Sequence, residues 1–196
     1  MGYYITRVIP IAILFLTFLF LFQRRKITSK KRLLPIFLSV LLVVVLWITP
    51  FENLFITFKS PESIFNYAGD GEIITVVDSP NSVAILTKKG QSNYSTFFCT
   101  KNEKGFQLTT FNQAKKISTA KYESITVSIY SIMGTDDYYL RIWGIVSDDI
   151  VITDVLNTDL QPIYEDWQGQ KIINLVAPIN YNNEYCCFIN GERISF

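Results

Sequence analysis

The segments Val8–Phe22 (VIPIAILFLTFLFLF) and Leu33–Phe51 (LLPIFLSVLLVVVLWITPF) set the front of this chain apart from the rest, because neither carries a charged residue. Between them, Gln23–Arg32 (QRRKITSKKR) holds six Lys or Arg in ten residues. A helix needs roughly 20 apolar residues to cross a bilayer. The pattern therefore predicts a hairpin of two transmembrane helices joined by a short basic loop.

The basic loop also predicts how this hairpin is oriented. With spans at about residues 4–22 and 33–51, the loop 23–32 is short, and short loops rich in Lys and Arg stay in the cytoplasm. Both termini are then extracytoplasmic, and the chain is an integral, two-span protein of the cell membrane. A cleaved signal peptide followed by one anchor is the alternative, and it fits less well because most of the positive charge follows the first apolar run.

The charge of the remaining chain narrows the class of partner. Seven of the 18 basic residues lie in residues 1–32, where there is no Asp or Glu, so the remainder carries 11 basic and all 17 acidic residues. A mildly acidic remainder argues against nucleic acid as its partner. We expect an extracytoplasmic protein, peptide or glycan partner instead.

Residues 52–71 are expected to form a stalk and one short helix. Ser60 suits the N-cap of this helix, Pro61 its first position and Glu62 its first turn. The turn Gly69-Asp70-Gly71 predicts that the helix ends by Ala68.

From residue 72 the apolar period changes to two, which predicts an all-β extracytoplasmic domain over residues 72–196. Short alternating runs separated by turn residues are typical of an antiparallel meander. The polar run 112–122 reads as a linker, so the domain is either one unit or two sub-domains, 72–111 and 124–196, the second of them β-sandwich-like. The expected strands are Ile73–Val77, Val83–Thr87, Asn93–Lys101, Phe106–Phe111, Ser124–Met133, Tyr138–Val146, Ile150–Val155, Pro162–Trp167, Ile172–Ala177 and Tyr185–Ile189.

The last hairpin carries the most specific local signal. Asn190-Gly191 suits a two-residue type I′ turn, because both residues accept a positive φ. This turn predicts that Ile189 pairs with Glu192 and Cys187 with Ile194. One buried face then consists of Tyr185, Cys187, Ile194 and Phe196.

The three cysteines and the absence of histidine limit the chemistry. Without histidine the chain lacks the commonest general base and metal ligand, and Cys99, Cys186 and Cys187 match no zinc spacing. We therefore expect no catalytic residue, no metal and no cofactor. Cys187 is expected to be a small buried apolar residue, and a disulfide between Cys99 and either Cys186 or Cys187 is the alternative for an extracytoplasmic domain.

Acidic residues occur close together at four places. The pairs Asp136-Asp137, Asp148-Asp149 and Glu165-Asp166 stand beside each other, and Asp154 lies near Asp159. Carboxylates of this kind bind calcium or serve a glycosidase, but none of them follows the spaced calcium-loop motif. We interpret them as solvated turn residues.

Aromatic residues make up 15% of the chain, and 11 of the residues are Tyr. In the predicted strands, four of them lie on faces opposite to or mixed with the aliphatic one: Tyr94, Tyr130, Tyr139 and Trp143. Cross-strand packing explains such residues. The functional hypothesis is an exposed aromatic surface that binds a partner.

One segment resembles a known group of proteins. The run Ser60–Tyr67 (SPESIFNY), the Gly-rich turn after it and Ile73–Val77 (IITVV) resemble small uncharacterised membrane-anchored extracytoplasmic proteins of low-GC Gram-positive bacteria. The resemblance covers roughly residues 60–145 and implies no activity, so no functional residue follows from it.

These patterns together predict a non-catalytic membrane protein whose β-domain binds or senses a partner at the cell surface. An accessory subunit of a membrane complex is one alternative, in which the hairpin packs on another protein. A cell-envelope hydrolase that uses an acidic pair is the other, and carboxylates gathered in a deep cleft would favour it.

Overall fold

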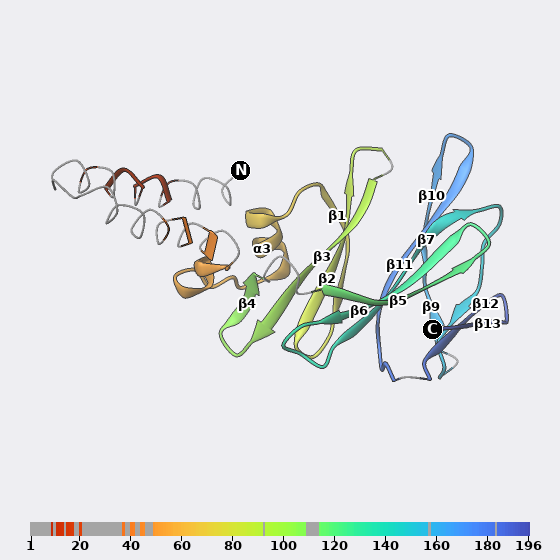
Figure 1. Cartoon of the computed structure of the whole chain (residues 1–196). Helices are drawn as coiled ribbons and strands as arrows, with labels where there is room; N and C mark the ends of the chain where they lie inside the picture. The colour runs from red at the N-terminus through yellow and green to blue at the C-terminus, as the bar shows by residue number, and fades with distance from the viewer. Residues whose placement is uncertain are drawn as a thin grey trace.

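The computed structural model describes residues 49–196 apart from 92, 109–113, 157 and 183, together with isolated residues between 9 and 45. This part of the chain is mainly β-sheet, as expected for residues 72–196. It is arranged in four layers, which are one helix and three antiparallel sheets stacked face to face (Figure 1).

Sheet A is an antiparallel meander in the order β1-β2-β3-β4. Its strand β2 reads SVAILTKK, and its first six residues are buried. Both faces of β2 are covered, so its sequence is nearly continuously apolar rather than alternating. The strands are β1 (Glu72–Asp78), β2 (Ser82–Lys89), β3 (Asn93–Asn102) and β4 (Gly105–Leu108).

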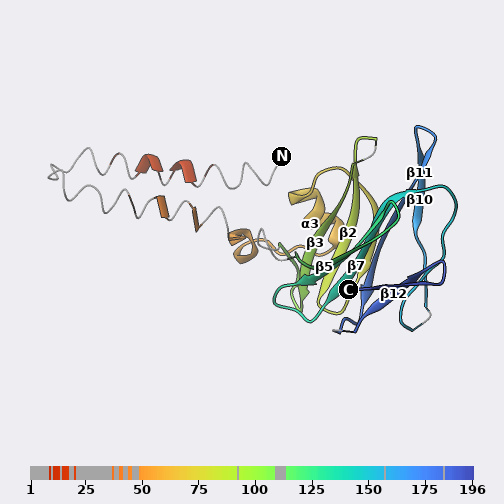
Figure 2. The ribbon, with the colours of Figure 1, turned by 45° about the vertical axis from the view of Figure 1, so that its right-hand side comes forward.

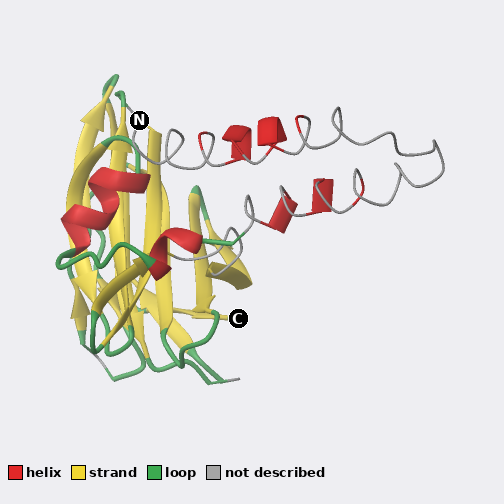
Figure 3. Cartoon of the chain, turned by 90° about the vertical axis from the view of Figure 1, so that its left-hand side faces the viewer, coloured by secondary structure: helices red, strands yellow, loops and turns green. Residues whose placement is uncertain are grey.

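The helix α3 (Pro61–Ala68) covers the outer face of sheet A (Figure 3). Ser60 caps it, and the capping box is completed by Ser63 rather than by an acidic residue. Ile64 and Phe65 pack against Val83, Ile85 and Cys99 of the sheet. A short 3₁₀ helix, η1 (Phe51–Leu54), precedes it, and the side chain of Asn53 bonds to the backbone of Leu108 in β4.

Sheet B is the central layer and has the strand order β10-β11-β7-β6-β5. Aliphatic residues on one of its faces, including Val127, Ile129 and Leu140, pack against sheet C. Ile132, Tyr139 and Val176 on its other face pack against sheet A. The strands are β5 (Ala114–Tyr122), β6 (Ile125–Ile132), β7 (Tyr138–Val146), β10 (Ile163–Trp167) and β11 (Gln170–Ile179).

Sheet C closes the stack with the order β13-β12-β8-β9, and the C-terminus lies beside it (Figure 2). Its strands are β8 (Ile152–Thr153), β9 (Asp159–Leu160), β12 (Cys186–Ile189) and β13 (Glu192–Ser195). The β12–β13 pairing confirms the predicted register, since Ile189 pairs with Glu192 and Cys187 with Ile194. Asn190 and Gly191 both have positive φ, as a type I′ turn requires.

The expected linker over residues 112–122 is wrong. Residues from Ala114 onward form β5, the edge strand of sheet B, which pairs with β6. Lys115, Lys116 and Lys121 are exposed on this strand. Lysines on an edge strand discourage pairing with another chain, and their polarity hid the strand in the sequence.

The predicted transmembrane hairpin is also wrong. No helix among the described residues is long and apolar enough to cross a membrane. The prediction rested on the length and apolarity of two segments, whereas a span requires one continuous helix of that length. Most of residues 4–22, 23–32 and 33–51 lies outside the described residues. The membrane class and the two-span, extracytoplasmic location that rested on the hairpin are therefore withdrawn.

Candidate functional site

Sheets A and B pack together tightly at one end of their interface. Ala84, Leu86 and Phe98 of sheet A contact Ile132, Tyr139 and Val176 of sheet B, and every one of these side chains is buried. We call this region the closed end. At the other end the facing side chains leave a pocket of about 530 Å³, a volume typical of small-ligand sites, which span roughly 300–1,000 Å³.

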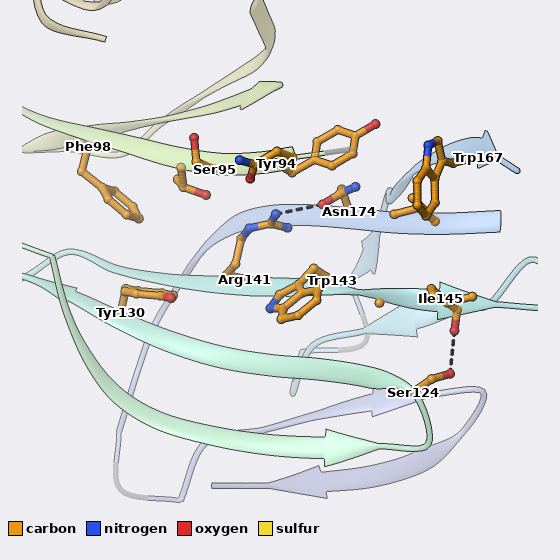
Figure 4. A pocket seen from close by; sticks show the side chains of 14 residues that line it. Tyr94, Ser95, Phe98, Ser124, Tyr130, Arg141, Trp143, Ile145, Trp167 and Asn174 are labelled. Atoms are coloured by element: carbon orange, nitrogen blue, oxygen red, sulfur yellow. Dashed lines mark hydrogen bonds between the residues drawn. The ribbon is translucent and has the colours of Figure 1, made fainter. Parts of the chain in front are cut away.

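Five aromatic side chains are among the residues that line this pocket (Figure 4). Trp143 stands on β7 and is 52% exposed, so the pocket is open to solvent on its side. The alternation of β3 turns its even-numbered residues toward sheet B. The aromatic lining residues are Tyr94, Phe98, Tyr130, Trp143 and Trp167, of which Phe98 also belongs to the closed end and marks the border between the two regions.

Arg141 is the one charged side chain among the described residues that line the pocket. It projects from β7 toward sheet A (Figure 4) and is only 6% exposed. Its Nη2 donates to Oδ1 of Asn174 at 2.8 Å, and its Nη1 donates to the carbonyl oxygens of Ile142 at 2.7 Å and Leu175 at 3.3 Å. Burial lowers the pKa of Arg141 to about 10, so the guanidinium remains charged at neutral pH.

No carboxylate pairs with Arg141 in the part of the chain that the structure describes. Lys88 of β2, in contrast, forms an ion pair with Glu165 of β10 and bridges the two sheets. The Nζ of Lys88 also lies 5.7 Å from the ring centre of Tyr94. Lys88 is thus neutralised, whereas Arg141 is held by uncharged groups.

Two further polar atoms of the lining have no hydrogen-bond partner among the described residues. These are Oγ1 of Thr96 and Nε1 of Trp167, and both are buried. A third such atom, the hydroxyl of Tyr185, belongs to a residue of the core between sheets B and C. Unpartnered buried polar atoms are rare and costly, and two of these three belong to residues that line the pocket.

A buried polar network links sheets A and B at the closed end. Asp137 accepts hydrogen bonds from the backbone N–H of Asn81 at 2.9 Å and from Oγ of Ser82 at 2.6 Å. Oγ of Ser82 also lies 3.0 Å from the hydroxyl of Tyr139. Burial raises the pKa of Tyr139 to about 12. Ser82 and Tyr139 are both 0% exposed, so this network holds the sheets together and is closed to a ligand.

The structure brings together three of the four aromatic residues that the sequence singled out. Tyr94, Tyr130 and Trp143 line the pocket. Tyr139 does not form part of an exposed surface, because it is fully buried at the closed end. Its hydroxyl is satisfied by Ser82, which is what allows a tyrosine to lie in a core.

The sequence interpretation missed Arg141, Asn174 and Trp167. A weak signal for Arg141 existed, since a charged residue stands between Leu140 and Ile142 in the middle of an apolar strand. Such a position predicts a polar face. It does not show whether that face meets solvent or another sheet.

The structure has Cys99, Cys186 and Cys187 as free thiols, so it does not contain the disulfide that was the alternative for them. Cys99 lies in the core between α3 and sheet A, whereas Cys187 lies in the core between sheets B and C. Cys186 is also on sheet C, two layers away from Cys99. Burial raises the pKa of Cys99 and of Cys187 to about 12, so both thiols are unreactive, and Cys187 is the buried apolar residue that was expected.

The acidic pairs do not converge on the pocket. Asp137 is part of the closed-end network and Glu165 pairs with Lys88. Asp154 closes a turn by accepting from the backbone N–H of Leu156 and Thr158. No group of three or more His, Cys, Asp or Glu among the described residues is placed to hold a metal ion.

Comparisons with known proteins identify no relative. No protein-family model, no curated protein and no solved structure matches the chain. The fold and the pocket define its class: a layered, mainly β protein with a ligand-sized pocket between two of its sheets. The resemblance to membrane-anchored proteins of low-GC Gram-positive bacteria stays a prediction.

Proposed function

We propose that the protein is a non-catalytic binding module that takes a flat apolar group of its partner into the pocket between sheets A and B. The observation that carries this proposal is the aromatic lining of a pocket of about 530 Å³. Aromatic walls bury a large apolar area in a defined geometry and favour planar groups.

The chemistry of the lining supports binding rather than catalysis. General acid–base and nucleophilic mechanisms need a titratable or nucleophilic group close to a base. Among the described lining residues the ionisable side chains are Arg141, Tyr94 and Tyr130, and arginine stays protonated at neutral pH. The chain contains no histidine. An acidic-pair hydrolase gains no support from the positions of the carboxylates.

A neutral fluorescent probe tests the binding role directly. N-phenyl-1-naphthylamine is uncharged and aromatic, and its fluorescence rises in apolar surroundings. We expect it to bind the full chain, and we expect Trp143→Ala and Tyr94→Ala each to weaken this binding by roughly 2- to 10-fold, the worth of one aromatic contact.

Phe55→Ala is the matched control. Phe55 is an exposed aromatic residue, 82% accessible, that does not line the pocket. Its loss should leave probe binding unchanged. If Trp143→Ala and Tyr94→Ala bind the probe as well as Phe55→Ala does, the pocket is not the binding site and the proposal fails.

A further inference from the structure

We propose that the pocket selects a ligand that joins a planar aromatic group to a single carboxylate, and that Arg141 holds the carboxylate. This inference rests on the binding role proposed above and specifies the chemistry of the partner. The observations that carry it are the buried guanidinium without a carboxylate partner, its unused donors, and the unpartnered polar atoms of two other residues that line the pocket.

Arg141 has donors to spare. A guanidinium carries five N–H groups, and the three hydrogen bonds to Ile142, Leu175 and Asn174 use at most three of them. Nε–H and one N–H of Nη2 therefore have no acceptor among the described residues. A carboxylate offers two oxygens in a plane, the geometry that arginine binds with two parallel hydrogen bonds.

The side chain is also held in place before a ligand arrives. Its partners Ile142, Leu175 and Asn174 belong to the neighbouring central strands β7 and β11. Asn174 is 1% exposed, so it is a fixed positioning residue rather than a mobile surface group. A preorganised donor loses little side-chain entropy on binding, which favours affinity.

The charge balance of the pocket favours one negative charge. The described lining residues include Arg141 as their one cation and no Asp or Glu, and Lys88 outside the lining is neutralised by Glu165. A monoanion compensates a single buried cation, whereas a phosphate dianion would leave one charge without a partner in a poorly solvated place. A carboxylate is therefore preferred to a phosphate.

Two further polar atoms of the lining residues are compatible with the same ligand. Nε1 of Trp167 can only donate a hydrogen bond, and Oγ1 of Thr96 can donate one. Both lack a partner among the described residues, and both atoms belong to residues that line the pocket with Arg141. Both groups are therefore compatible with acceptor oxygens of a ligand, although the hydroxyl of Thr96 can accept as well as donate.

A matched pair of probes separates this inference from the binding role. 2-Naphthoate and 2-naphthamide share their aromatic body, and only the first carries a negative charge at neutral pH. By isothermal titration calorimetry with the full chain, we expect naphthoate to bind roughly 10- to 100-fold more tightly, the worth of hydrogen bonds to a charged group. Arg141→Met should remove this preference.

Arg193→Met is the matched control for the loss of a cation. Arg193 is exposed on β13 of sheet C and does not line the pocket, so this variant should keep the preference. Arg141→Lys keeps the positive charge without the two-donor fork and should lose most of the preference. Arg141→Lys also tests the assignment if Arg141→Met does not fold. Circular dichroism of each variant establishes whether it is folded.

The outcomes distinguish the two proposals. Equal binding of naphthoate and naphthamide to the wild type would overturn the carboxylate assignment and leave the binding role intact, whereas binding of neither probe would overturn both. A preference that survives in Arg141→Met or Arg141→Lys would show that the fork of Arg141 does not hold the carboxylate. Tighter binding of 2-naphthyl phosphate than of naphthoate would overturn the assignment to a monoanion.

Discussion

The two faces of sheet B differ although the same strands build both. On the face toward sheet C, β7 places Leu140 and Ile142 in a filled aliphatic core. On the face toward sheet A, the same strand places Arg141 and Trp143 in a pocket. β11 repeats the contrast, with Leu175 in the core and Asn174 beside Arg141.

The difference shows which face of sheet B contributes less to the stability of the fold. The sheet C face buries aliphatic side chains that stabilise the fold by roughly 1.5–3 kcal/mol each. The sheet A face buries a guanidinium without a carboxylate partner, an arrangement that destabilises a fold. A local departure from good packing beside a well-packed core is typical of a functional site.

The largest expected effect on the free energy of unfolding comes from a substitution on the face of sheet B that packs against sheet C. Ile142→Ala should lower the free energy of unfolding by about 2–5 kcal/mol, because Ile142 is fully buried and its loss leaves a cavity. Trp143→Ala, one residue further along β7, should change it by less than about 1 kcal/mol because this side chain is half exposed. Urea unfolding of both variants measures the contrast, and equal losses would contradict it.

A substitution at the closed end should lower the free energy of unfolding by a smaller amount. Asp137→Ala removes the acceptor of the Asn81 N–H and of the Ser82 hydroxyl, and unpartnered buried donors of this kind cost about 1–3 kcal/mol. Asp136→Ala changes the exposed neighbour and is the control, expected within about 0.5 kcal/mol of the wild type. If Asp137→Ala melts at the same temperature as the wild type, the network does not stabilise the packing of the two sheets.

Alkaline pH should gradually lower the free energy of unfolding. Burial raises the pKa of Cys99 and of Cys187 from 9.0 to about 12, and that of Tyr139 from 10.0 to about 12. A raised folded-state pKa gives stability that is complete below the unfolded-state pKa and is lost as pH approaches the folded-state value. Unfolding free energies should therefore fall above pH 9. The decline should be shallower in Cys187→Ala, and a decline of wild-type steepness in that variant would contradict this origin.

The smallest net effect should come from Arg141. Arg141→Met removes the cost of a buried cation but leaves the buried acceptors on Ile142, Leu175 and Asn174 without their donor, so we expect the free energy of unfolding to change by less than about 1 kcal/mol. The same urea measurement checks this. A loss of more than about 1 kcal/mol would show that Arg141 stabilises the fold, and the contrast between the two faces of sheet B would then need another explanation.

Much of the local structure was readable from the sequence. Asn190-Gly191 fixed a turn and through it the register of Cys187 with Ile194, and Ser60-Pro61 fixed the start of α3. These features depend on residues close together in the chain. The edge strand β5 was missed because its lysines face away from any core, and the transmembrane hairpin was wrongly inferred from apolar composition.

The residues of the candidate site could be predicted only in part from the sequence. The sequence singled out Tyr94, Tyr130 and Trp143, which line the pocket, but it equally singled out Tyr139, which is buried. It treated Cys99 and Cys187 as candidates for one bond, and they lie in different cores. Both errors have the same cause, since a strand pattern does not say which layer lies opposite each face.

The sequence by itself determined the alternation that puts Leu140 and Ile142 on one face of β7 and Arg141 and Trp143 on the other, because side chains of a strand point to opposite sides in turn. Only the tertiary structure decided that the first face would be a core and the second a pocket. That choice depends on contacts between residues far apart in the chain, such as Arg141 with Asn174, and on sheet A leaving space beside them.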